Sequence, residues 1–130
     1  MAYNENFTIK GLQKAQADNQ RRIAMFRPHG EIEQEIKDTT IEAQRFAISI
    51  THVWHDRGGA LRASHRMKME RGRGIIYIDP KAVNPRGQKP SVYGFYENKR
   101  GGDHAFYDRT VEEFKEKAVS KVNKRVKVNL

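Results

Sequence analysis

Several histidines and acidic residues are spaced so that their side chains could bind a metal ion together. The 130 residues include five histidines and no cysteine. On a helix, residues three and four positions apart share a face, which would bring His52, His55 and Asp56 together. Such a trio could bind one divalent ion if His104 supplied a fourth ligand. Histidines at a helix end also complement the negative pole of the helix dipole, so we predict a structural helix end with no bound metal and no cofactor.

Three further residues raise the question of nucleic-acid cleavage. Asp79 ends an expected strand, and Glu97 and His104 follow it along a strongly basic chain. Two-metal phosphodiester chemistry requires carboxylates that converge on one point, whereas these acids are isolated among basic loops. The sequence therefore favours a protein that is not an enzyme, with a nuclease as an alternative.

Two common enzyme motifs are missing from the sequence. The segment Gly72-Arg73-Gly74 lacks the Gly-Lys-Ser/Thr ending of a phosphate-binding loop. Ser64 has only a chance neighbour in His65 and is not part of a nucleophile motif. These absences are a second reason to predict that the chain is not an enzyme.

A long uninterrupted segment, residues 31–56, must position the first histidines. It contains no proline or glycine before Arg57-Gly58-Gly59. Its apolar residues recur at three- and four-residue steps, which predicts a helix about 35–40 Å long that ends at the glycines. The residues of this stripe are Ile32, Ile36, Ala43, Phe46, Ala47, Ile50, Val53 and Trp54.

A second apolar stripe, Ile41 and Ile48, lies on another face of this helix. An apolar surface on more than one side of a helix must be covered from more than one side. We therefore expect the rest of the chain or a neighbouring copy to cover it.

The other elements flank this helix. A first helix is predicted over residues 4–26, an antiparallel hairpin over residues 64–70 and 74–79, and a closing amphipathic helix from Phe106 to Val126. In the closing helix, we expect Phe106, Val111 and Phe114 to share the buried face.

The fold class predicted from these elements is α+β. A long helix and a small antiparallel sheet should pack with N- and C-terminal helices. Residues 1–30 should form an N-terminal helical arm, and residues 31–130 a single domain.

An aromatic-rich segment, residues 91–97, could be a strand or a single helical turn. Its rings Tyr93, Phe95 and Tyr96 lie between basic loops and could stack on single-stranded nucleic acid. Their spacing fits core packing at least as well.

Positive charge is unevenly distributed in this chain of net charge +9. Residues 57–73 carry six Lys or Arg against one Glu, residues 80–100 carry five against one, and residues 117–130 carry five against none. The segment 31–56 instead carries six acids against two bases. Basic loops suggest contact with a polyanion or an acidic protein surface, and the alternative is a solvated surface without a partner. The loop residues that could make this contact are Lys81, Arg86, Lys89, Lys99 and Arg100.

Two absences bear on the compartment in which the chain is made. Without cysteine it forms no disulfide, which fits a reducing compartment. No apolar run approaches the roughly 20 residues that span a bilayer, and residues 1–10 lack the layout of a signal peptide. We expect synthesis in the cytoplasm and no membrane partner.

Two short motifs are more specific than these general features. The first, Gly59-Ala60-Leu61-Arg62-Ala63-Ser64, follows the long helix. The second, Tyr93-Gly94-Phe95-Tyr96-Glu97, follows the hairpin and precedes a glycine-bearing loop and His104-Ala105-Phe106-Tyr107.

This arrangement resembles the tail-completion, or head-tail joining, proteins of long-tailed bacteriophages. In that family a helix leads into a Thr-Gly-x-Leu-Arg-x-Ser turn, a hairpin follows, and a Tyr-Ala-x-Tyr-x-Glu-x-Gly segment precedes a Pro-Phe that starts the last helix. The similarity covers about residues 31–120. The matching residues are Gly59, Leu61, Arg62, Ser64, Tyr93, Tyr96, Glu97 and Phe106.

The resemblance implies a structural virion subunit that forms a homo-oligomeric ring, of six copies, at the neck between head and tail. Such a ring caps the tail and contacts the head-closure or connector ring and a tail-tube or tail-terminator protein. Double-stranded DNA passes through its lumen without sequence recognition. The subunit would be found in the virion, and in the host cytoplasm during assembly. A head-closure (stopper) subunit of the same neck and a small basic nucleic-acid-binding protein are the alternatives.

Overall fold

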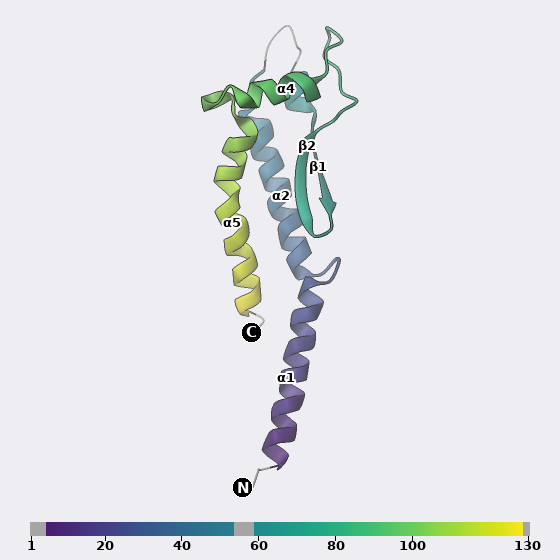
Figure 1. Cartoon of the computed structure of the whole chain (residues 1–130), viewed down its shortest axis with the longest axis vertical. Coiled ribbons are helices and arrows are strands. Elements are labelled where there is room, and N and C mark those ends of the chain that lie inside the picture. Colours follow the sequence, from purple (N-terminus) through teal and green to yellow (C-terminus); the bar gives the residue numbers. More distant parts are fainter. Residues whose placement is uncertain (1–4, 54–58, 129–130) are drawn as a thin grey trace.

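The computed structural model describes residues 5–53 and 59–128 and, within these, the side chains of residues 11–53 and 59–127. Helices dominate, and one two-stranded antiparallel sheet packs against them (Figure 1). The predicted α+β class is confirmed. Among the described residues, no helix is both long and apolar enough to cross a membrane.

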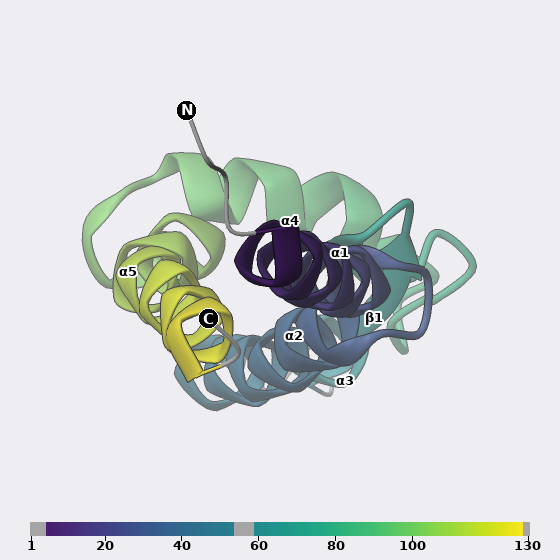
Figure 2. The same ribbon diagram turned by 90° about the horizontal axis from the view of Figure 1, so that it is seen from below.

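Helix α1 (Glu5–Phe26) extends beyond the packed body of the molecule, nearly in line with helix α2 (Glu31–Ile50) (Figures 1 and 2). The turn between them is tightly built. A Cβ atom on Gly30 would lie 2.5 Å from the carbonyl oxygen of Ala24, so only glycine fits there. The backbone N–H of His29, at a φ of 64°, donates to Glu33 Oε2 over 2.8 Å. These contacts fix the direction in which α1 leaves the body.

Helix α2 is shorter than predicted. It ends at Ile50, so the predicted helix over residues 31–56 is wrong at residues 51–53, and residues 54–56 lie outside the described residues. Its 20 residues span about 30 Å. Thr51 turns to an extended backbone, with a ψ of 129°. Arg62, distant in sequence, donates from Nε to the Thr51 carbonyl over 3.0 Å and from Nη2 to the Ser49 carbonyl over 3.3 Å. The last carbonyls of α2 are thus capped by a side chain from beyond the glycine turn.

The predicted hairpin is present. Strands β1 (His65–Glu70) and β2 (Arg73–Ile78) pair antiparallel, with His65 opposite Ile78 and Glu70 opposite Arg73. The two-residue turn uses positive φ at both Arg71 (52°) and Gly72 (75°), the backbone of a type I′ connection. Such a turn matches the twist of the strands and sets their register.

The hairpin packs directly on α2 through Gly74. A Cβ atom built on Gly74 would lie 1.7 Å from Thr40 Oγ1 and 2.7 Å from Thr40 Cβ. Thr40 has little freedom to move, because its hydroxyl donates to the Ile36 carbonyl over 2.7 Å. The backbone of β2 therefore touches α2 where no side chain fits between them.

Replacing Gly74 with alanine should destabilise the protein by about 1–3 kcal/mol, because the added methyl group must push the hairpin off α2. Chemical denaturation followed by circular dichroism measures this change. Gly11→Ala is the matched control, because its Cβ would meet open space on α1 and alanine favours a helix. Equal unfolding midpoints for the two variants would show that the close approach of β2 to α2 at Gly74 does not contribute to stability.

Two helices complete the body. Residues 91–97 form neither a strand nor a single turn; they lie within helix α4 (Pro90–Lys99), which crosses one end of the molecule (Figure 1). Proline suits the first position of α4 because that N–H has no helical partner. After the 3-10 turn η2 (Gly102–His104), helix α5 (Phe106–Val128) runs antiparallel beside α2.

The contact between α2 and α5 combines one aromatic pair with two ion pairs. Phe46 and Phe114 meet edge to face, with ring centroids 5.6 Å apart. Lys121 pairs with Glu42 over 3.2 Å, and Arg125 pairs with Glu35 over 3.1 Å. Exposed ion pairs stabilise little, so the apolar contact holds the two helices together.

Three expectations about buried faces have different outcomes. Phe106 is buried as predicted, with 1% of its surface exposed. Val111 does not share its buried face, because 59% of its surface is exposed. Ile41 and Ile48, the second stripe on α2, are half-buried within the single chain.

Candidate functional site

The two sequence motifs meet where helix α3 (Ala60–Ala63), α4 and α5 come together. Leu61 of α3 and Phe106 of α5 are both almost completely buried. A methyl group on Gly94 of α4 would lie 2.7 Å from Leu61 Cδ1 and 3.8 Å from Phe106 Cζ. The glycine therefore lets α4 approach both neighbours. Residues more than thirty positions apart in the chain form one apolar junction.

The first motif builds the connection from α2 to the hairpin. Gly59 precedes α3 with a φ of 71°, a left-handed backbone that favours glycine. Arg62 caps α2, as described above. Ser64 is buried, and its hydroxyl donates to the Leu61 carbonyl over 2.8 Å, while its own carbonyl accepts the N–H of Asp79. Each of these residues thus has a structural contact.

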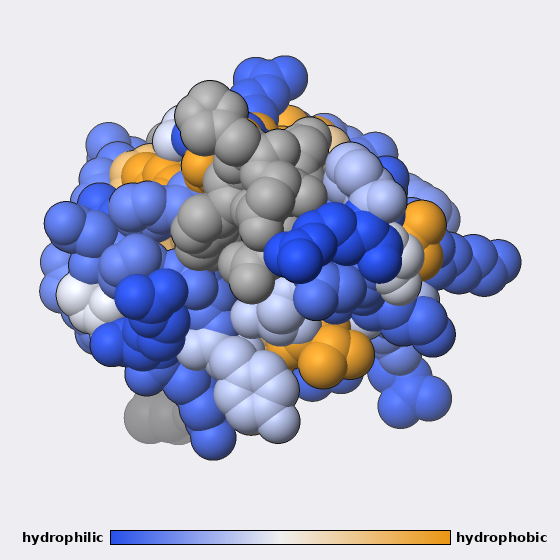
Figure 3. All heavy atoms as spheres, turned by 90° about the horizontal axis from the view of Figure 1, so that it is seen from above, coloured by the Kyte–Doolittle hydropathy of each residue, from blue (hydrophilic) through white to orange (hydrophobic). Residues whose placement is uncertain are grey.

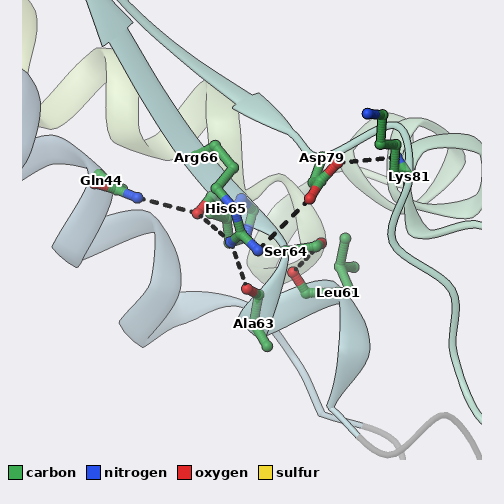
Figure 4. Close-up of polar contacts among 8 residues, drawn as sticks. All are labelled: Gln44, Leu61, Ala63, Ser64, His65, Arg66, Asp79 and Lys81. Carbon is green, nitrogen blue, oxygen red and sulfur yellow. Dashed lines mark hydrogen bonds and ion pairs between the residues drawn. The ribbon is translucent and has the colours of Figure 1, made fainter.

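A polar cluster joins this connection to the end of the hairpin (Figure 4). Arg66 donates to the Ala63 carbonyl over 2.8 Å and lies 3.6 Å from Asp79 Oδ2. Asp79 Oδ1 accepts the backbone N–H of Lys81 over 2.9 Å, which starts the loop after β2. Gln44 of α2 donates to the His65 carbonyl over 3.0 Å. Asp79, the first acid considered for cleavage, is therefore held by its own chain.

The second motif organises the start of α5. Glu97 is buried and contacts both Arg100, at 3.1 Å, and the imidazole of His104. The side chain of neighbouring Asn98 accepts the backbone N–H of Tyr107 over 3.0 Å, as an N-terminal cap does. Asp79 and Glu97 therefore have separate cationic partners and are not paired with each other.

Of the histidine and aspartate trio considered for a metal ion, the structure describes only His52. His52 lies beyond the end of α2, and its ring stacks on that of His104 with centroids 4.5 Å apart. His55 and Asp56 lie outside the described residues. Within residues 5–53 and 59–128, no group of three or more His, Cys, Asp or Glu side chains is placed to hold a metal ion.

Another histidine, His65, was not singled out by its spacing but lies at the centre of a buried hydrogen-bond network. It is 2% exposed, its Nε2 lies 2.8 Å from Thr51 Oγ1, and its Nδ1 lies 2.9 Å from the Tyr107 hydroxyl. Thr51 donates its own proton to the Ala47 carbonyl over 2.6 Å. Nε2 must therefore carry the imidazole proton and donate to Thr51, and Nδ1 accepts from Tyr107. This series of hydrogen bonds links α5, β1 and the end of α2.

Burial sets the protonation of this network. Desolvation, with the neighbouring charge of Arg66, lowers the pKa of His65 from 6.5 to about 4. Desolvation also raises the pKa of Tyr107 above its ordinary value of 10. Both shifts favour the neutral groups that the hydrogen-bond directions require.

The five basic residues expected to make contacts do not form one patch. Lys81, Arg86 and Lys89 lie in the loop before α4, and Lys99 and Arg100 lie at the other end of that helix. Ten helical residues separate the two sets by about 15 Å. Both sets lie at the end of the molecule shown in Figure 3, where a largely hydrophilic surface is broken by separate apolar patches.

The loop between β2 and α4 is internally hydrogen bonded through buried Asn84. Its side-chain oxygen accepts the N–H groups of Arg86 and Gln88 over 3.0 and 2.9 Å, and its backbone N–H donates to the Gln88 carbonyl. The loop therefore presents its lysines from a defined turn.

The aromatic residues of α4 divide between two faces. Tyr93 is half-buried, whereas Phe95 and Tyr96 are 55% and 64% exposed and contact each other edge to face at 5.5 Å. Lys99 lies 4.7 Å from the Phe95 ring centroid. Core packing is thus the wrong interpretation for Phe95 and Tyr96.

Comparison of the chain with protein-family models, with curated proteins and with solved structures found no match. The function must therefore be inferred from the residues and their arrangement.

Proposed function

We propose that the chain is a tail-completion, or head-tail joining, subunit of a long-tailed bacteriophage. The observation that carries this proposal is the meeting of the two motifs at Leu61, Gly94 and Phe106. The order of elements, a helix, a glycine turn, a hairpin and a final helix, also matches the order in which the family's motifs occur.

In this proposal the subunit forms a homo-oligomeric ring, of six copies, in the virion neck. The ring contacts the head-closure or connector ring on one side and a tail-tube or tail-terminator protein on the other. DNA passes through the lumen without recognition of its base sequence. The protein acts as a structural component and catalyses no reaction. A head-closure subunit of the same neck would also form a ring that contacts its neighbours and surrounds the DNA, so it is the nearest alternative.

Charge at the α4 end supports contact with an acidic ring or with passing DNA. Lys81 and Lys89 are exposed on the ordered loop, and Lys99 is exposed at the far end of α4. Groups spaced in this way can meet phosphates or acidic side chains without entering a groove to read bases.

A nucleic-acid-binding protein of another class is a second candidate. It is favoured by one observation, the exposure of Phe95 and Tyr96 beside Lys99. Exposed rings with a neighbouring cation can stack on the bases of a single strand. Selective binding of single-stranded over double-stranded oligonucleotides, lost in Tyr96→Ala, would favour this candidate over the neck.

Reversing two charges, in Lys81→Glu with Lys89→Glu, tests the neck contact. If the loop meets DNA, affinity should fall similarly for every sequence, and the slope of log K against log salt should become shallower by about 0.9 for each lost phosphate contact. If it meets an acidic ring, docking to the isolated neck should weaken instead. Binding is measured by fluorescence anisotropy for DNA and by sedimentation for the neck.

The matched control for this experiment is Lys124→Glu with Lys127→Glu, two exposed lysines at the end of α5. These reversals change the net charge equally but lie far along α5 from α4 (Figure 1). An equal effect of both pairs would mean that net charge alone matters, and strong discrimination among DNA sequences would favour a regulator over a neck subunit.

A further inference from the structure

An apolar groove of about 440 Å³ lies between α2, β2 and α5. Its apolar walls include Ile36 and Ala43 from α2, Ile76 from β2, and Val111, Phe114 and Ala118 from α5. Lys115 is its one charged lining residue among those the structure describes. Along α5 the lining runs from Tyr107 to Ala118, eleven helical steps or about 16 Å. The groove thus has the length and the chemistry to hold about three turns of an apolar helix face.

Helix α1 carries such a face. Leu12, Ala15, Asn19, Ile23 and Phe26 fall within about 80° of one another around the helix, and every one of these side chains is exposed. Leu12 and Ile23 are eleven residues apart, the same span as the groove lining on α5. The part of the stripe from Leu12 to Ile23, apolar except for Asn19, therefore matches the groove in length, and Phe26 extends the stripe by about one further turn.

The contact of α1 with its own body leaves this face uncovered. Met25 is buried, and it lies about 120° around the helix from the centre of the stripe. All the other described side chains of α1 are exposed except half-buried Asp18. A lone helix with so little tertiary contact is marginally stable in water, so α1 needs a partner surface.

The same chain cannot easily supply that surface. The Gly30 turn and the hydrogen bond from His29 to Glu33 direct α1 away from the groove, along the line of α2 (Figures 1 and 2). Folding α1 back would break both features. A second copy of the chain offers an identical groove without that cost.

We infer that the α1 stripe of one copy docks into the α2–β2–α5 groove of the next. This inference deepens the proposed function, since it rests on the homo-oligomer and names the contact that builds it. The stripe and the groove are different surfaces, so each copy gives one and receives one. Such a heterologous contact repeats from copy to copy and closes into a ring when the rotation allows.

Engineered cysteines test the contact directly, because the chain has none of its own. Chains carrying Ile23→Cys are mixed with chains carrying Val111→Cys, oxidised mildly and separated without reductant. We expect a disulfide-linked pair containing one chain of each kind. The matched control replaces Val111→Cys with Val119→Cys, which is on the same helix, equally exposed at 61%, and outside the groove lining. Equal yields from the two mixtures would overturn the inference.

Charge substitutions test whether the contact builds the oligomer. Leu12→Glu with Ile23→Glu on the stripe, or Val111→Glu on the groove, should raise the dissociation constant at least tenfold for each side chain, the value of burying one such residue. Gln13→Glu with Gln20→Glu, on another face of α1, and Val119→Glu should leave it unchanged. Sedimentation velocity of the full chain gives these constants.

The outcomes separate this inference from the proposed function. A dimer or filament that depends on the stripe and the groove supports the contact and contradicts a neck ring. A ring that survives the stripe substitutions supports the neck and overturns the contact. A wild-type chain that stays monomeric and yields no specific disulfide overturns the contact as well. Loss of assembly in Val111→Glu alone would mean that another segment fills the groove, which also contradicts the inference.

Discussion

Replacing Phe106 with alanine should lower the free energy of unfolding by about 3–5 kcal/mol. The side chain is 1% exposed and contacts the ring of His65, with centroids 5.2 Å apart, and that of Tyr107, at 4.6 Å. It also approaches the position where Gly94 brings α4 against α5. Truncation would leave a cavity where three helices and a strand meet, and the loss is comparable to the whole stability of a domain of this size.

Urea denaturation at neutral pH measures this loss. Val111→Ala is the matched control, because it shortens an apolar side chain five residues further along α5 that is 59% exposed. A surface truncation of this kind should change the free energy by no more than about 0.5 kcal/mol. If Phe106→Ala cost as little as the control, the junction would not hold the helices together.

The same variant distinguishes the proposed functions when it replaces the wild-type protein in an infected cell. A failed tail-completion subunit should leave heads filled with DNA and tails of normal length, with few joined particles. Empty heads as the main product would contradict tail joining and favour head closure. A nucleic-acid-binding protein would fail earlier, in genome processing or expression.

Local sequence signals predicted several elements because local physics determines them. The period of the apolar residues located α1 and α5, and the segment Arg71-Gly72-Arg73-Gly74 between an alternating and a β-branched segment located the hairpin. These patterns depend on neighbours within one or two turns. They can therefore be read without knowing the rest of the fold.

The errors arose where distant contacts decide the structure. Nothing near Thr51 signals a helix end, because Arg62, eleven residues later, caps the carbonyls there. Helix α4 contains Gly94, a residue that usually weakens helices, and the close approach of Leu61 that requires a glycine there comes from a distant element. His65 looked like a chance neighbour of Ser64, because its partners Thr51 and Tyr107 come from other elements.

The same limit applies to the candidate site. The motif residues Leu61 and Phe106 were identified in advance, and the predicted burial of Phe106 is confirmed. Leu61 is buried as well, which the sequence did not predict. The division of α4 into an inner face with Tyr93 and an outer face with Phe95 and Tyr96 could not be predicted, since all three rings are compatible with either side of a short helix. Only the packing of α4 against α3, β2 and α5 decides between them.

The stability of the folded chain should depend on pH through His65. In the folded chain the imidazole accepts a hydrogen bond from the Tyr107 hydroxyl at Nδ1 and donates one to Thr51 Oγ1 from Nε2, so neither nitrogen is free to take a second proton. Its folded pKa is lowered to about 4 from an ordinary value of 6.5. Between these two values the unfolded chain binds more protons than the folded one, so stability rises with pH across this window.

We therefore expect the contribution of His65 to be fully present above pH 6.5 and to be lost as the pH falls toward 4. A shift of this size corresponds to about 3 kcal/mol across the window. Urea unfolding at several values between pH 7.5 and 5 measures how the free energy of unfolding changes over the upper part of this window, before carboxylates begin to titrate. His65→Gln, which cannot gain a proton, should flatten this slope, whereas His52→Gln, at an exposed position, should preserve it. If His65→Gln and the wild-type chain lost stability equally between pH 6.5 and 5, the neutral network joining α5 to the end of α2 would not control the pH response. The slope would then have to come from another titrating group.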